Sequence, residues 1–208
     1  MLDFYFMMEG AEPVLYSASP LLTFHVRINT NKPFAIHSIA LRCQIMLEVT
    51  QRHYSDQEKA QMKDLFGEPE RWTQTLRTML WTHSSMVVSP FSDTTLVDLP
   101  VPCSFDFNVA ATKYFAGLKD GEVPLSLLFS GSVFYEGEGG GLQVLQIPWE
   151  KECKYRMPID VWKRMMDIYY PNTNWLCIRR DVFEKLYEYK VKHGIPTWEQ
   201  TLEAIIPA

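Results

Sequence analysis

The chain contains five histidines and four cysteines, the side chains that most often bind transition metals in proteins. No two histidines have the HxxxH spacing of a helical metal site, and no two cysteines have the CxxC spacing of a zinc site. A metal site would therefore need side chains from distant strands, and His25 with His37 or His83 is the best combination. We expect no cofactor. The histidines are expected to be exposed at the surface or hydrogen-bonded rather than bound to a metal.

Nucleophilic catalysis needs an activated serine or cysteine beside a base. The FSG stretch at 129–131 lacks the preceding glycine of a GxSxG nucleophile elbow. Cys103 follows Pro102 and opens an alternating segment, which favours packing over reactivity. We therefore expect a protein that is not an enzyme and has no catalytic or metal-binding residue. If the fold hides a polar site, the residues to inspect are His25, Arg27, His37, His83 and Asp106.

The glycine-rich segment 137–141 resembles a phosphate-binding loop, but its context differs from that of a dinucleotide fingerprint. Such a fingerprint lies between a strand and a helix, whose N-terminal amides meet the phosphates. Here Leu142, Val144 and Gln146 continue with the period of a strand, and Glu136 and Glu138 would repel a phosphate. We expect a β-hairpin loop.

The C-terminal part of the chain is rich in aromatic residues and contains an Arg-Arg pair. Tryptophan, tyrosine and arginine dominate the binding energy of protein interfaces. The same aromatic side chains could instead pack the helices onto the rest of the fold, and this alternative remains open. The residues predicted to contact a partner are Trp162, Tyr169, Tyr170, Trp175, Arg179, Arg180 and Trp198.

Hydrophobic periodicity divides the chain into a strand-rich part and a helical part. Apolar residues alternate with polar ones in segments such as 22–28 and 39–49, which is typical of half-buried strands. Ser55 and Glu58 have capping-box spacing, and a helical insertion is expected at about 55–78. We predict a mainly β, α+β fold, an antiparallel β-sandwich that is Ig-like in general architecture, over residues 1–157. Residues 158–208 should form a helical section on or beside it.

Composition limits the class of protein and of partner. A hydrophobic content of 47% is enough for a substantial core, and the net charge of −5 disfavours nucleic acid as a partner. No apolar stretch approaches the length of a membrane span, and no signal peptide is visible at the N-terminus. We expect a cytoplasmic protein. Its widely spaced cysteines are then predicted to be buried free thiols: Cys43, Cys103, Cys153 and Cys177.

Nine short stretches in order along the chain resemble one family. They are EGAEP at 9–13, LFGEPERW at 65–72, LWTH at 80–83, LPVPC at 99–103, GEVPL at 121–125, LFSG at 128–131, PW at 148–149, RRD at 179–181 and PTWE at 196–199. The family is an uncharacterised bacterial one, a domain of unknown function encoded beside high-affinity group 1h nickel–iron uptake hydrogenases. The resemblance implies an accessory role and supplies no catalytic residues.

Three functions compete on this basis. The first is an accessory protein that binds a hydrogenase subunit or a maturation component through its aromatic C-terminal section. The second is a small-ligand-binding protein or enzyme with a cleft between sandwich and helices. The third is a metal-handling chaperone for a nickel–iron enzyme.

Overall fold

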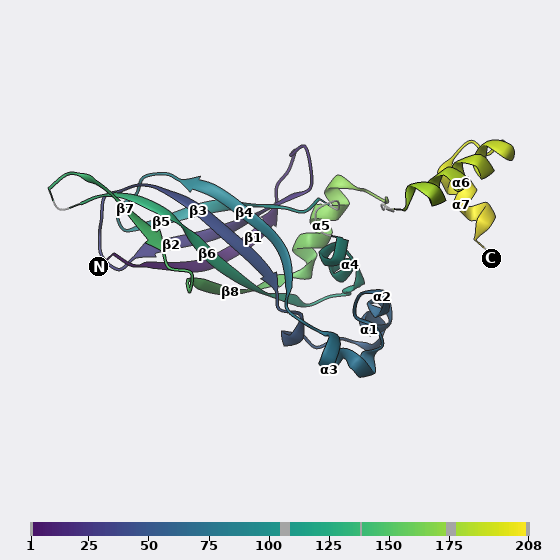
Figure 1. The fold of residues 1–208 in the computed structure, drawn as a ribbon, viewed down its shortest axis with the longest axis horizontal. Helices are drawn as coiled ribbons and strands as arrows, with labels where there is room; N and C mark the ends of the chain where they lie inside the picture. The colour runs from purple at the N-terminus through teal and green to yellow at the C-terminus, as the bar shows by residue number, and fades with distance from the viewer. Residues whose placement is uncertain (1, 105–108, 138, 174–177, 207–208) are drawn as a thin grey trace. The chain divides into compact units, whose positions relative to one another are not determined.

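The computed structural model describes residues 2–104, 109–137, 139–173 and 178–206. The chain divides into two compact units, Met1–Pro171 and Asn172–Ala208. The first contains all strands of the described residues, and the second contains the last two helices (Figure 1). Among the described residues, no helix combines the length and the apolar character that crossing a lipid bilayer requires.

Two antiparallel sheets pack against each other in the first unit (Figure 1). Sheet A has the order β1-β2-β5, and sheet B has the order β4-β3-β6-β7, with β8 paired to the first half of β6. The strands of sheet A are β1 (Phe4–Pro13), β2 (Leu21–Thr30) and β5 (Thr94–Pro102). Those of sheet B are β3 (Ile36–Leu47), β4 (Met79–Val88), β6 (Glu122–Glu136), β7 (Leu142–Ile147) and β8 (Glu152–Pro158). The predicted antiparallel sandwich within an α+β fold is confirmed.

The core lies between the two sheets because alternate side chains of each strand point inward. Leu22, Phe24, Val26 and Ile28 of β2 have no exposed surface. Phe6 of β1 stacks on Phe129 of β6 with ring centroids 4.1 Å apart, which joins sheet A to sheet B. The glycine-rich segment connects β6 to β7, which pair in antiparallel register, so the predicted hairpin is also confirmed.

The helical insertion connects β3 to β4. It consists of η1 (Val49–Gln51), α1 (Asp56–Gln61), α2 (Lys63–Phe66), η2 (Pro69–Arg71) and α3 (Trp72–Thr75). Ser55 caps α1: its Oγ accepts the Glu58 N–H at 3.3 Å, and its own N–H donates to Glu58 Oε2 at 2.9 Å, as the capping box predicts. The helical insertion was expected to extend to about residue 78. In the structure its last helix ends at Thr75, and from Met79 the chain pairs with β3.

Two further helices belong to the first unit: α4 (Val109–Gly117) and α5 (Ile159–Tyr169). We expected residues 158–208 to form a helical section on or beside the sandwich. The first helix of that section, α5, belongs to the unit Met1–Pro171 and buries Val161, Trp162 and Met165 in its core. Trp162 stacks on Phe115 of α4 with ring centroids 5.2 Å apart.

The second unit contains α6 (Arg180–Lys192) and α7 (Trp198–Ile205). Gly194, at a φ of 64°, lies just after α6, where a left-handed residue suits a helix end. Thr197 caps α7, and its side chain accepts the Gln200 N–H at 3.2 Å. Both helix boundaries agree with the sequence signals.

Candidate functional site

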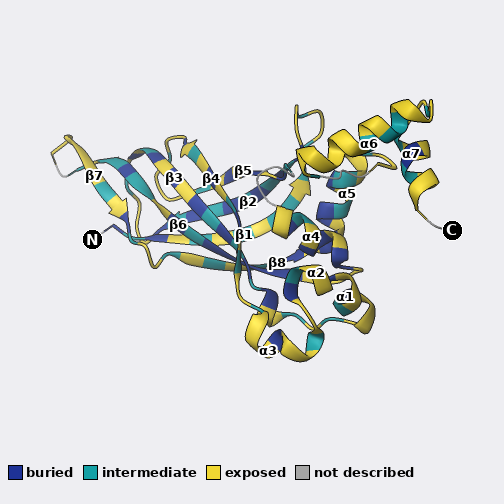
Figure 2. Cartoon of the chain, turned by 45° about the vertical axis from the view of Figure 1, so that its right-hand side comes forward, coloured by how far each residue is buried: buried dark blue, intermediate teal, exposed yellow. Residues whose placement is uncertain are grey.

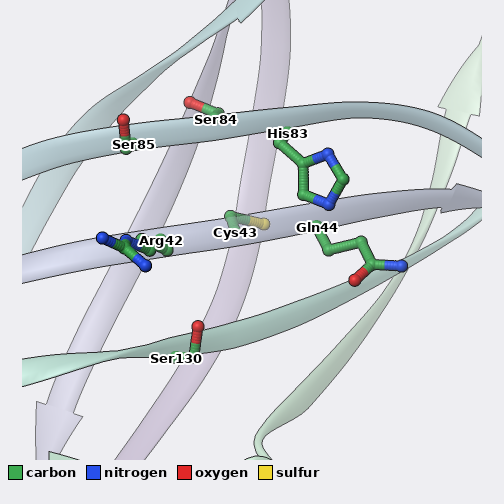
Figure 3. A pocket seen from close by; sticks show the side chains of 7 residues that line it. All are labelled: Arg42, Cys43, Gln44, His83, Ser84, Ser85 and Ser130. Carbon is green, nitrogen blue, oxygen red and sulfur yellow. The ribbon is translucent and has the colours of Figure 1, made fainter.

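A groove lies on the outer face of sheet B, over β4, β3 and β6 (Figure 3). Because Cys43 points into the core, its neighbours Arg42 and Gln44 point outward. Ser85 of β4 and Ser130 of β6 stand directly opposite Arg42, one on each side. These short side chains leave a hollow of about 420 Å³ beside the long arginine. We call this hollow the Arg42 groove, and its lining is Arg42, Cys43, Gln44, His83, Ser84, Ser85 and Ser130.

The Arg42 groove offers hydrogen-bond donors and no carboxylate. Within the described part of the chain, the Arg42 side chain has neither an ion-pair nor a hydrogen-bond partner. His83 stands opposite Gln44 in the register, two residues along β4 from Ser85, and Figure 3 shows the His83 and Gln44 side chains next to each other. An arginine fork with hydroxyl and imidazole groups around it suits an oxyanion.

The two remaining lining residues have side chains directed inward. The Ser84 hydroxyl donates to the carbonyl oxygen of Pro100 in β5, and the Cys43 thiol is buried. Burial raises the pKa of the Cys43 thiol to about 12, so it is protonated at neutral pH and is a poor nucleophile. The groove therefore has the chemistry of a binding site rather than that of covalent catalysis.

The outer face of sheet A has a different set of polar side chains, which contact one another. His25 of β2 lies between two carboxylates, with its Nδ1 2.7 Å from Asp98 Oδ1 and its Nε2 3.4 Å from Glu12 Oε1. Arg27, on the same face, forms an ion pair with Glu9 of β1. The hydrogen bond from Arg27 lowers the pKa of the Glu9 carboxyl. His25 and Arg27 therefore each have a carboxylate of the same sheet as a partner.

The structure does not gather into one place the four described residues among the five candidates for a hidden polar site. His25 and Arg27 lie on the outer face of sheet A, whereas His83 lies on that of sheet B. His37 is exposed near the start of β3, and Asp106 lies outside the described residues. Across the described residues, no group of three or more histidine, cysteine, aspartate or glutamate side chains could hold a metal ion.

A buried ion pair within the helical insertion also binds the chain at the start of β6 through hydrogen bonds. Arg52 Nη2 donates to Glu58 Oε1 at 2.8 Å, and the side chains are only 9% and 5% exposed. The same guanidinium donates to the carbonyl oxygens of Asp120 and Glu122, both at 2.5 Å. Burial acts to raise the pKa of Glu58, but the N–H groups of Lys119 and Ser55 and the Arg52 charge outweigh it and lower the pKa. Capping-box spacing identified Glu58, but nothing in the spacing indicated its burial or its partner.

The predicted partner-contact residues fall into both units. Trp162 is buried, and the Tyr169 hydroxyl donates to the Val14 carbonyl oxygen at 2.7 Å, so both side chains hold the first unit together. Tyr170 is half-buried at the end of α5, and Trp175 lies outside the described residues. In the second unit Arg179 precedes α6 and pairs with Asp181 at 3.0 Å, and Arg180 is exposed at the first position of α6.

Trp198 of α7 lies within an aromatic cluster that α6 supplies. Its ring centroid is 5.2 Å from that of Phe183 and 6.3 Å from that of Tyr187, and the Lys190 ammonium lies 5.8 Å from the ring. Phe183 and Tyr187 nevertheless remain 45% and 52% exposed. No residue of α6 is buried. Figure 2 accordingly shows α6 as a largely exposed helix. We define the α6 face by its exposed apolar side chains: Val182, Phe183, Tyr187 and Val191.

A family model described as "Family of unknown function (DUF6084)" matches residues 1–208. A comparison with curated proteins gave no match. The family match covers the whole chain, and its description names no activity.

Proposed function

We propose that this chain, which belongs to the DUF6084 family of unknown function, is a non-enzymatic accessory protein that binds a protein partner through its second unit. The partner we propose is a subunit or maturation component of a nickel–iron hydrogenase, as the sequence resemblance implies. In this proposal the sandwich is a rigid scaffold, and the α6 face is the contact.

The exposed α6 face is the observation that carries the proposal. The second unit, Asn172–Ala208, is 37 residues long (208 minus 171). Chains shorter than about 40 residues rarely bury enough apolar surface to fold alone, and usually need a metal, a disulfide or association. Thr201 is the only residue of α6 and α7 that is buried in the described structure. A helical pair with so little interior gains stability when another surface covers its apolar side chains.

The composition of the α6 face suits a protein partner. Phe183 and Tyr187 present large rings that lose little conformational entropy on binding, and such residues are frequent anchors at interfaces. Contacts with Trp198 already hold both rings in place. Arg180, at the edge of this face, would favour a partner with carboxylates around an apolar patch.

A tagged full chain with the changes Phe183→Ser and Tyr187→Ser tests the proposal. Recovery of nickel–iron hydrogenase subunits from the native host, quantified by mass spectrometry, should fall at least about tenfold, because two central apolar anchors are lost. The matched control is Leu142→Ser, which removes a side chain that is 65% exposed on β7 of the first unit. Recovery should be unchanged for this control. Equal recovery with all three proteins would refute the proposal.

A further inference from the structure

We propose that the Arg42 groove is a binding site for the oxyanion group, phosphate or carboxylate, of a small soluble ligand. The inference is independent of the proposed partner contact, since it concerns the outer face of sheet B and no residue of α6 or α7. Arg42 would form a bidentate pair with the oxyanion, and Ser85 and Ser130 would donate from either side.

The charge distribution is the first argument. The chain has 25 acidic residues against 20 basic ones, yet none of the seven residues that line the groove is acidic. Arg27 forms an ion pair with Glu9, and Arg52 forms one with Glu58. The Arg42 guanidinium has no such partner among the residues that the structure describes, so its donors are available to an external anion.

The second argument is preorganisation. Arg42 lies on a central strand with ladder partners on both sides, Ser85 on β4 and Ser130 on β6. Directly opposed residues in antiparallel strands have Cβ atoms about 5 Å apart, so the hydroxyls flank the arginine at a fixed spacing. Such paired strands fix the backbone in advance, so mainly the Arg42 side chain has to be ordered when a ligand binds.

The third argument concerns size. The groove has a volume of about 420 Å³, within the range of pockets that hold small molecules, about 300–1,000 Å³. Its position on an open sheet face leaves part of a ligand in water. We therefore expect a dissociation constant on the order of 1 mM for a simple anion, and tighter binding for a ligand whose remaining atoms fill the groove.

Titration of the isotope-labelled full chain by NMR, at constant ionic strength, tests the site with two probes, inorganic phosphate and succinate. At least one probe should cause saturable shifts in β3, β4 and β6, and the probe that binds identifies the preferred oxyanion. Arg42→Gln should weaken that binding at least about tenfold, because it removes the charged fork. Its melting temperature should be unchanged, since the side chain is exposed. Arg156→Gln, an equal charge loss at an exposed position of β8, is the matched control and should leave binding unchanged.

Two results would overturn the inference. One is the absence of saturable shifts with either probe up to about 50 mM, which is far above the expected dissociation constant. The other is binding that Arg42→Gln leaves intact, or that Arg156→Gln weakens equally, since either would mean general charge screening rather than a site. Because neither variant touches α6, the titration gives its answer whether or not the hydrogenase experiment succeeds.

Discussion

The change Glu58→Gln tests the buried ion pair between Arg52 and Glu58, whose further hydrogen bonds hold the helical insertion to the start of β6. Glutamine keeps the shape of the side chain and one acceptor oxygen, but it leaves the Arg52 guanidinium without a counter-charge. That guanidinium would keep only uncharged acceptors, among them the Asp120 and Glu122 carbonyl oxygens. The substitution therefore keeps the packing of Glu58 and removes its charge together with one acceptor oxygen.

The expected loss in free energy of unfolding follows from the burial of the ion pair. Breaking a buried pair by removing one partner typically costs about 3–5 kcal/mol, and we take the lower end because the carbonyl acceptors remain. A loss of about 3 kcal/mol corresponds to a fall of about 6–12 °C in melting temperature for a domain of this size. The matched control is Asp56→Asn in the same helix. Asp56 is 99% exposed and pairs with Lys59, so its loss should cost less than about 1 kcal/mol.

The pH dependence has a definite sign. The folded chain lowers the pKa of Glu58 below its ordinary value of 4.5. The resulting stabilisation is fully present above that ordinary value and is lost as the pH falls through the lowered folded value. The difference in unfolding free energy between wild type and Glu58→Gln should therefore be largest at neutral pH and should shrink in acid.

Urea unfolding followed by tryptophan fluorescence, at neutral pH and in acid, measures these differences. The double variant Arg52→Met with Glu58→Gln should lose less stability than the sum of the two single variants, since neither charge is then left alone. Equal effects of Glu58→Gln and Asp56→Asn, or a difference that grows in acid, would refute the reasoning.

Two other predictions concern the sandwich. An alanine Cβ at Gly131, where φ is 147°, would lie 2.1 Å from the Ala40 carbonyl oxygen, so Gly131→Ala should lower the free energy of unfolding by about 3 kcal/mol in urea titrations. Gly141→Ala, whose Cβ would meet nothing within 4 Å, should change it by less than about 0.5 kcal/mol, and equal losses would contradict the clash. Burial raises the pKa of Cys43 and of Cys103 to about 12, so at pH 8 about one thiol in ten thousand is ionised. Iodoacetamide should therefore label both thiols only after the chain is unfolded, and peptide mass spectrometry would detect the label. Labelling of the native chain within minutes would contradict their burial.

Local patterns predicted much of the fold. The alternation from Leu22 to Ile28 identified a strand whose apolar side chains are fully buried. The Ser55 capping box identified the start of α1, and the glycines after β6 identified a hairpin. Each of these signals lies within a few residues of sequence, where backbone geometry decides the outcome.

The Arg42 groove could not be predicted in this way. Ser85 and Ser130 are far from Arg42 in sequence, and only the strand order β4-β3-β6 and its register bring the three together. The sequence pattern also does not show which of the C-terminal helices pack on the sandwich, for a related reason. Both α5 and α6 have an apolar stripe, and only packing distinguishes the buried Trp162 from the exposed Tyr187.

Hydrogen exchange of the full chain, with and without purified nickel–iron hydrogenase from the same host, tests the central proposal most directly. Free α6 should exchange quickly, since none of its residues is buried. With hydrogenase present, exchange of the α6 and α7 amides should slow at least about tenfold, while that of β3, β4 and β6 stays constant. Unchanged exchange in both helices at saturating hydrogenase would contradict the proposed contact.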